Sequence, residues 1–145
     1  MTNMTNMPTA TNTEQEPQKP QNHKYYKDYF DHEKLDVYQA SISLIILIDA
    51  IVRKLPRGRS YLSDQLLRAG TSVPLNIAEG AGEFSANEKI RFYRMARRSA
   101  TECSGIMDVC QQLNLIEENN YSKGRELLLR IVAMLTKMAR ITAPS

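Results

Sequence analysis

The stretch TSVPLNIAEGAGEF, residues 71–84, decides how this chain folds. It lies between two segments with helical periodicity, yet it places Pro74 in an apolar run and ends in two glycines, Gly80 and Gly82. A proline inside a helix removes one backbone hydrogen bond and clashes with the preceding turn, which costs about 3 kcal/mol or bends the helix. Residue 70 is also a glycine, which leaves space for such a distortion. We therefore expect a helix that either bends near the proline or stops and restarts there, and that ends at the two glycines.

Apolar residues recur at steps of three and four on both sides of this stretch, which is the spacing of amphipathic helices. Ser85 and Glu88 match a capping box, in which each side chain bonds the backbone N–H group of the other residue, and they predict the start of a helix. With short connections and no alternating strand pattern, the chain is predicted to be an all-α, up-down-up-down four-helix bundle over 25–145. The expected helices cover about 31–55, 60–80, 86–113 and 121–141.

The first and fourth helices carry more apolar surface than one face requires. Each has two neighbouring apolar stripes, whereas a helix of a monomeric bundle usually needs one. The second stripes consist of Tyr38, Ile42, Ile45, Asp49 and Val52 in the first helix, and of Leu128, Val132, Leu135 and Ala139 in the fourth. Because a large apolar face is rarely left in water and rotational closure hides it, we expect a closed homo-oligomer.

The N-terminal segment differs in composition from the rest of the chain. Residues 1–24 are rich in Thr, Asn, Gln and Pro, so we expect a disordered tail, and they lack the pattern of a signal peptide. The most apolar run, 42–52, is shorter than the about 20 residues of a membrane span. Cys103 and Cys110 lie about 10.5 Å apart along one helix, too far for a disulfide. These features predict a cytoplasmic protein with reduced core cysteines and no membrane contact.

Positive charge is concentrated in the middle of the chain. The formal net charge is +3, but residues 50–100 carry ten Lys and Arg against four Asp and Glu. In the third helix three arginines fall on one face. They lie opposite a seam of mostly small residues at steps of three and four, which consists of Tyr93, Ala96, Ala100, Cys103, Met107 and Cys110. The candidate nucleic-acid-binding residues are Arg53, Lys54, Arg57 and Arg59 around the turn between the first and second helices, and Arg91, Arg94, Arg97 and Arg98 in the third helix.

Arginine suits phosphate because its planar fork donates two hydrogen bonds. Few aromatic residues share this face, so we expect binding to the RNA or DNA backbone with little base preference. In a single copy, the same charges are equally consistent with an ordinary solvated face.

A second polar cluster surrounds Pro74 and the helix that follows it. We interpret it as a structural polar network that fixes the joint between the second and third helices. Asn76 can bond backbone groups that the proline frees, and Arg68 opposite Glu79 or Glu102 would balance their charges. The alternative is a catalytic site, for which no activated nucleophile stands out. The members of the cluster are Gln65, Arg68, Ser72, Asn76, Glu79, Ser99 and Glu102.

The sequence offers little else for chemistry. His23 and His32 are the only histidines, and no paired His or Cys motif of a metal site is present. No glycine-rich phosphate loop and no Ser-His-Asp arrangement can be recognised. We therefore expect no metal, no cofactor and no enzymatic activity.

The stretch 65–103 resembles the four-helix-bundle family of proteins encoded in intervening sequences of bacterial 23S ribosomal RNA genes. The shared pattern is an Arg-Ala pair, Ser-x-Pro-x-Asn-Ile-Ala-Glu-Gly, a Phe or Tyr, and Ala-x-x-Ser-x-x-Glu. Residues 34–41, KLDVYQAS, also match the family's entry into the first helix, so that the resemblance covers about 30–141. The matching positions are Arg68, Ala69, Ser72, Pro74, Asn76, Ile77, Ala78, Glu79, Gly80, Tyr93, Ala96, Ser99 and Glu102.

This resemblance implies a ring-shaped homopentamer. It also implies kinship with the accessory variability determinant of diversity-generating retroelements, a basic pentamer that binds nucleic acid and a reverse transcriptase. Three functions stay open on the sequence: a nucleic-acid-binding oligomer that acts with ribosomal RNA or a reverse transcriptase, a protein–protein interaction scaffold, and an enzyme that uses the cluster around Asn76.

Overall fold

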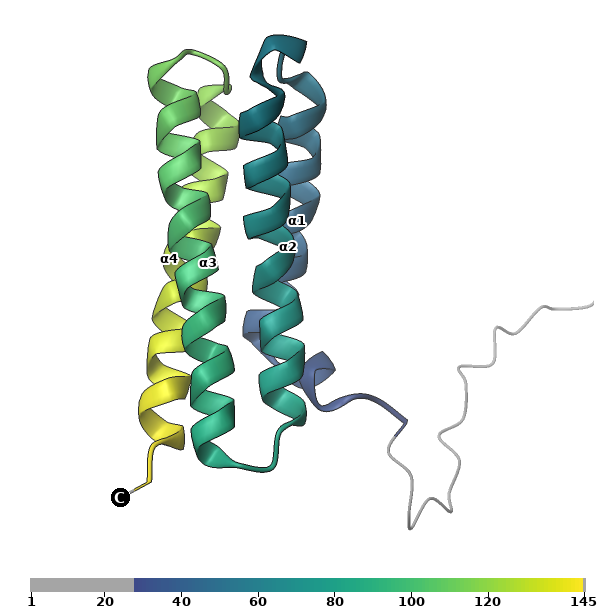
Figure 1. Cartoon of the computed structure of the whole chain (residues 1–145), viewed down its shortest axis with the longest axis vertical. Coiled ribbons are helices and arrows are strands. Elements are labelled where there is room, and N and C mark those ends of the chain that lie inside the picture. The colour runs from purple at the N-terminus through teal and green to yellow at the C-terminus, as the bar shows by residue number, and fades with distance from the viewer. Residues whose placement is uncertain (1–27, 145) are drawn as a thin grey trace, which may run out of the picture.

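The computed structural model of the protein describes residues 28–144, so the tail expected over 1–24 lies outside the described residues. Four long helices alternate in direction and are joined by short connections, without any strand in the described part of the chain (Figure 1). The four-helix bundle predicted from the sequence is therefore confirmed. The helices are α1 (Asp36–Lys54), α2 (Ser60–Gly82), α3 (Ala86–Gln112) and α4 (Glu118–Thr142), and the 3-10 helices η1 (Asp31–Lys34) and η2 (Arg57–Arg59) precede α1 and α2.

The expected first helix is divided at Leu35. This residue has an extended backbone, with φ −81° and ψ 126°, and separates η1 from α1. The Glu33 carboxylate accepts a hydrogen bond from the Phe30 N–H at 3.2 Å. The His32 ring packs edge-on against the Tyr38 ring, with 4.6 Å between the two ring centres. These local contacts favour the separate 3-10 turn and let the partly buried Leu35 pack against the core.

Helix α2 runs through Pro74 without interruption, so the alternative in which it stops and restarts is wrong. Pro74 is buried in the middle of the helix. Gly70 has a different role from the one expected: a Cβ atom there would lie 2.6 Å from Cδ1 of Ile48 and 3.2 Å from Cδ1 of Ile45. The missing side chain therefore allows α1 to approach α2 closely, and the side chains of α1 fill the space in front of Gly70.

The core is formed by all four helices, each of which packs against its neighbour in the chain, with α1 also packing against α4. The small-residue seam of α3 is buried as predicted, from Tyr93 to Cys110. Among the largest fully buried side chains are Leu44, Ile48 and Ile51 of α1, Leu66 and Ile77 of α2, Met107 of α3, and Ile131 and Leu135 of α4.

The second apolar stripes of α1 and α4 are covered to a large extent within one chain. Tyr38, Ile45 and Val52 are partly buried and pack against the core, although Asp49 is exposed. On α4, Leu128 and Leu135 are buried. The large apolar side chains left most open on these helices are Ile46, Leu129 and Ile141.

Candidate nucleic-acid interface

The first half of α3 presents the basic stripe that the sequence predicted. Arg91, Arg94 and Arg98 are all exposed on this helix. Arg94 and Arg98 make no hydrogen bond or ion pair with any residue from 28 to 144. Two permanently charged guanidinium groups are therefore available to a ligand.

These arginines border a groove between α3 and the chain end that follows α4. Its volume is about 580 Å³. The lining residues belong to the first half of α3 and to the segment after α4, and both segments lie at the end of the bundle where α2 turns into α3 (Figure 1). The groove combines apolar side chains with guanidinium groups, and its lining residues are Asn87, Ile90, Arg91, Arg94, Met95, Arg98, Ala143 and Pro144.

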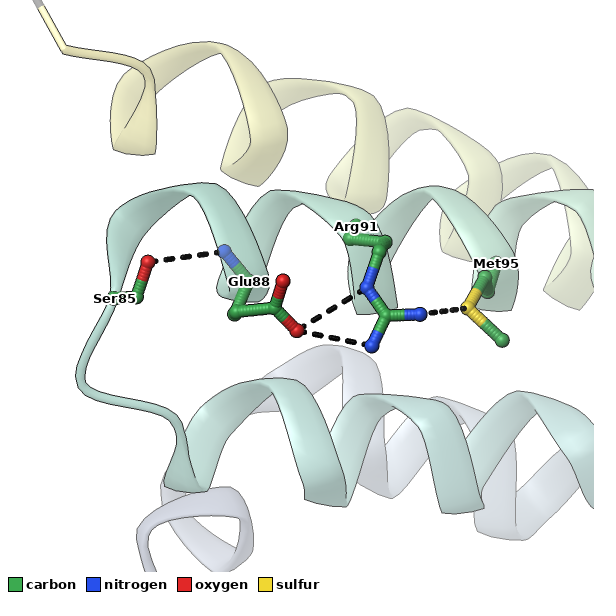
Figure 2. A network of polar contacts seen from close by, with 4 residues as sticks. All are labelled: Ser85, Glu88, Arg91 and Met95. Atoms are coloured by element: carbon green, nitrogen blue, oxygen red, sulfur yellow. Dashed lines mark hydrogen bonds and ion pairs between the residues drawn. The ribbon is translucent and has the colours of Figure 1, made fainter.

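Arg91 differs from the other two arginines because its guanidinium is held within the protein (Figure 2). Its Nη2 and Nε atoms donate to one carboxylate oxygen of Glu88 at 2.9 and 3.2 Å, and its Nη1 contacts the sulfur of Met95 at 3.8 Å. The hydrogen bond and the charge of Glu88 raise the pKa of Arg91, with smaller contributions from the charges of Glu83 and Glu79. Arg91 is thus fixed in position, and its charge is largely balanced.

The same contacts correct the predicted capping box. The Ser85 hydroxyl accepts a hydrogen bond from the Glu88 N–H at 3.4 Å, as expected for an N-cap. The Glu88 carboxylate, however, turns to Arg91 and not to the backbone of Ser85 (Figure 2). An arginine three residues further along the helix competes with the weaker return bond to the cap, because a charge-assisted bond is the stronger of the two.

Arg97 joins two helices and is less accessible than its neighbours. Its side chain is partly buried, and Nη1 donates to the Thr136 hydroxyl of α4 at 3.3 Å. Thr136 in turn donates to the Val132 carbonyl at 2.7 Å. Arg97 was predicted to bind nucleic acid, but in the structure it connects α3 to α4.

The basic residues of the α1–α2 turn lie at the opposite end of the bundle (Figure 1). The 23 residues of α2 separate the two ends by about 33 Å. Arg53 pairs with Asp49 at 3.0 Å, and Lys54 pairs with Glu117 at 3.0 Å. The two basic segments therefore do not form one surface within a protomer.

The other two arginines of this turn differ in their contacts. Arg59 donates to the Tyr61 hydroxyl at 3.0 Å. Arg57 is exposed and has no hydrogen bond or ion pair with the part of the chain that the structure describes. Of the four basic residues predicted in this turn, only Arg57 thus has no protein partner among the described residues.

The structure brings together three members of the predicted polar network. Asn76 donates to the Ser72 carbonyl at 2.8 Å and to the Ser72 hydroxyl at 2.9 Å, and the Ser99 hydroxyl donates to the Ser72 hydroxyl at 2.9 Å. The bond between Ser99 and Ser72 connects α2 to α3, whereas the two bonds of Asn76 lie within α2. Asn76 bonds a carbonyl that the helix already uses, and not the one that Pro74 leaves free.

The four remaining members of that network lie at the surface. They are exposed and make no hydrogen bond or ion pair with any described residue, so the expected pairing of Arg68 with an acid of the cluster does not occur. These members are Gln65, Arg68, Glu79 and Glu102.

Lys89 completes the joint, a role that was not predicted from the sequence. Its ammonium group donates to the carbonyls of Gly80 at 3.2 Å and Ala81 at 2.9 Å, and so caps the last turn of α2. A lysine near the N-terminus of α3 is unfavourable for the dipole of its own helix. This mismatch is the sequence signal that could have pointed to a partner at the end of α2.

Gly80 lets the two helices meet at this joint. A Cβ atom there would lie 2.8 Å from Cε1 of Tyr93 and 3.0 Å from Cβ of Phe92. The backbone of α2 therefore rests directly on two aromatic residues of α3, which fixes the end of the bundle that bears the groove.

Two described side chains that could take part in chemistry, Cys103 and His32, are held by their surroundings. Burial, with a smaller effect of the nearby Glu102 charge, raises the pKa of the Cys103 thiol to about 12, so this thiol is not activated. His32 lies between the rings of Phe30 and Tyr38. Within residues 28–144 no three acidic, His or Cys side chains are placed to hold a metal ion, and no helix is both long and apolar enough to cross a bilayer.

Comparisons with known proteins agree with this architecture. The model of a family described as 23S rRNA-intervening sequence protein matches residues 33–137. A crystal structure from Bacteroides thetaiotaomicron VPI-5482, described as a protein with unknown function from the S23 ribosomal protein family, superposes with a TM-score of 0.67. The two sequences are 22% identical, and the match covers 72% of this chain and 95% of that chain, so the likeness shows a shared fold. No curated protein sequence matches the chain.

Proposed function

The chain belongs to the family of 23S rRNA-intervening sequence proteins, and from this premise we propose that it is a non-enzymatic, oligomeric protein that binds the sugar–phosphate backbone of RNA or DNA. The observation that carries the proposal is the pair Arg94 and Arg98, which are exposed on α3 without a partner among the described residues. A guanidinium group without a protein partner can form the two parallel hydrogen bonds that a phosphate group accepts.

Spacing along the helix supports this role. Arg94 and Arg98 are four residues apart, which places them about 6 Å apart along one face of α3. Successive phosphates of a nucleic-acid strand lie at a comparable separation, so one strand segment can contact both arginines. Each contact would release counterions, and the affinity should therefore fall as the salt concentration rises.

The oligomeric part of the proposal is supported by the apolar side chains that remain open. Ile46 of α1 is 66% exposed and Leu129 of α4 is 59% exposed, and the two helices pack against each other. Further copies of the chain that covered these side chains could close into a ring. Each copy would present the same arginine pair, so that the positive charges of all copies would act together on a polyanion. The family resemblance provides the number five, and it directs the proposal to ribosomal RNA or to nucleic acid handled by a reverse transcriptase.

Binding can be tested by fluorescence anisotropy with a labelled RNA hairpin and a DNA duplex at about 50 mM and about 200 mM salt. The wild type should bind both, and Arg94→Ala/Arg98→Ala should lose most of the affinity. The matched control is Arg68→Ala/Arg130→Ala, which removes two exposed arginines that have no partner among the described residues and are not among the candidate nucleic-acid-binding residues. This control should bind like the wild type.

Two results would change the proposal. If the wild type binds neither probe at the lower salt concentration, the protein–protein scaffold becomes the better account of the exposed surface. If light scattering returns the mass of one chain at micromolar concentration, the proposed oligomer is wrong.

A further inference from the structure

The groove beside Arg94 and Arg98 has a composition that phosphate binding alone does not explain. A surface that only attracts phosphates needs exposed cations. Here the guanidinium groups border apolar side chains, with Ile90 and Met95 from α3 and Pro144 from the chain end. The volume of about 580 Å³ lies in the range of pockets that enclose a small organic ligand.

We propose that this groove binds one unstacked nucleotide of a single-stranded RNA or DNA. In this arrangement the base stacks on the guanidinium of Arg91 and lies against Met95 and Pro144. The phosphates on either side of the base contact Arg94 and Arg98. The inference rests on the proposed function, because it assigns the form of nucleic acid that the same arginines bind.

Arg91 has the properties of a stacking surface. Its guanidinium is held by two hydrogen bonds to Glu88, and its Cζ atom lies 4.6 Å from the centre of the Phe92 ring. With its charge balanced and its orientation fixed, it is less suited to a phosphate than Arg94 or Arg98. Proteins that recognise single strands stack unpaired bases on such arginine planes.

The groove fits this occupant better than it fits the alternatives. In a duplex the bases are stacked and paired, so only the phosphates could reach the arginines. A partner helix requires a row of apolar anchors over about two turns, whereas the apolar part of this groove consists of a few side chains. The exposed amide of Asn87, at the same groove, can exchange hydrogen bonds with a base edge.

The test is a variant that fills the groove without changing charge. Ala143 is exposed and lines the groove, whereas Ala133 is exposed on α4 and is not among the lining residues. Ala143→Phe and the matched control Ala133→Phe would be titrated with a labelled single-stranded 10-mer RNA and with a 10-base-pair duplex. Binding of the duplex also reports that each variant is folded.

We expect Ala143→Phe to weaken binding of the single strand about fivefold to tenfold, which corresponds to the loss of one stacked base. Binding of the duplex should change less than about twofold, and Ala133→Phe should change neither affinity. An equal change for both probes, or no change for either, would overturn the groove proposal. If the duplex still depends on Arg94 and Arg98 in that case, the proposed function stands. If the wild type binds no nucleic acid at all, both proposals fail.

Discussion

The two ends of the bundle are both basic in sequence, but they use their positive charges differently. At the α1–α2 end, Arg53, Lys54 and Arg59 each have a protein partner. At the α2–α3 end, Arg94 and Arg98 have none among the described residues and border a groove. The second end therefore presents two neighbouring guanidinium groups that a polyanion can use without first breaking a contact within the protein, whereas the first end presents only Arg57 in the described part of the chain.

This difference shows why charge counted along a sequence is a poor measure of binding surface. The partner of Lys54 is Glu117, which lies 63 positions away in the chain and reaches the turn only because α4 begins beside it. In the first half of α3, Glu88 binds Arg91, and neither Arg94 nor Arg98 has an acidic partner among the described residues. The distribution of acids in space, and not the number of bases, separates the two ends.

The largest stability effect should come from the close helix contact that fixes the α2–α3 end. Gly80→Ala would place a methyl group against the Tyr93 ring, and we expect it to destabilise the protein by about 2 kcal/mol. Gly82→Ala is the control, because a Cβ atom there meets nothing within 4 Å and α2 should gain up to about 1 kcal/mol of helix propensity. Denaturant unfolding at one fixed protein concentration measures both values.

Gly58→Ala extends this test to the other end of the bundle. A Cβ atom at Gly58 also meets nothing within 4 Å, so this variant should leave the free energy of unfolding unchanged or raise it slightly. A Gly80→Ala protein as stable as the Gly82→Ala and Gly58→Ala proteins would show that the α2–α3 end is not held by close contact.

Asn76→Ala should have the next largest effect. Its amide donates two hydrogen bonds to Ser72, and their loss should destabilise the protein by about 1 to 2 kcal/mol. Asn119→Ala, at an exposed position of α4, serves as the control and should cost much less. If the two variants unfold at the same denaturant concentration, the hydrogen bonds between Asn76 and Ser72 do not stabilise the joint.

The smallest effect should come from the ion pair at the α1–α2 end. The side chains of Lys54 and Glu117 are 61% and 64% exposed, so solvent screens their attraction. A double-mutant cycle with Lys54→Met and Glu117→Gln should give a coupling energy of about 0.5 kcal/mol. A coupling energy above about 1.5 kcal/mol would contradict the expectation that solvent screens this exposed ion pair.

Most of the fold could be predicted from the sequence because helix periodicity and breakers are local signals. The steps of three and four in α3 identified the buried seam from Tyr93 to Cys110. The break at Leu35 was missed because it depends on ring packing around His32. A helix that continues through Pro74 was one of two alternatives, and a helix that stops and restarts there was the other. Local propensity could not decide between them, because packing against α1 and α3 supports the helix.

The candidate site was less predictable because it depends on contacts between helices. Ser72, Asn76 and Ser99 were identified because the two serines and the asparagine border the core on facing helices. The capping role of Lys89 requires the end of α2 to lie beside the start of α3. The groove was not visible in the sequence, since it forms only where the chain end meets α3.

The central claim is that the unpaired arginines at the α2–α3 end bind phosphate, and the salt dependence of nucleic-acid binding tests it most directly. The logarithm of the affinity for an RNA hairpin would be plotted against the logarithm of the salt concentration for three proteins. Compared with the wild type, Arg94→Ala/Arg98→Ala should have a slope that is shallower by about two, one for each lost phosphate contact, and Arg68→Ala/Arg130→Ala should keep the wild-type slope. A wild-type slope in the first double variant, or an equal loss of slope in both double variants, would contradict the account.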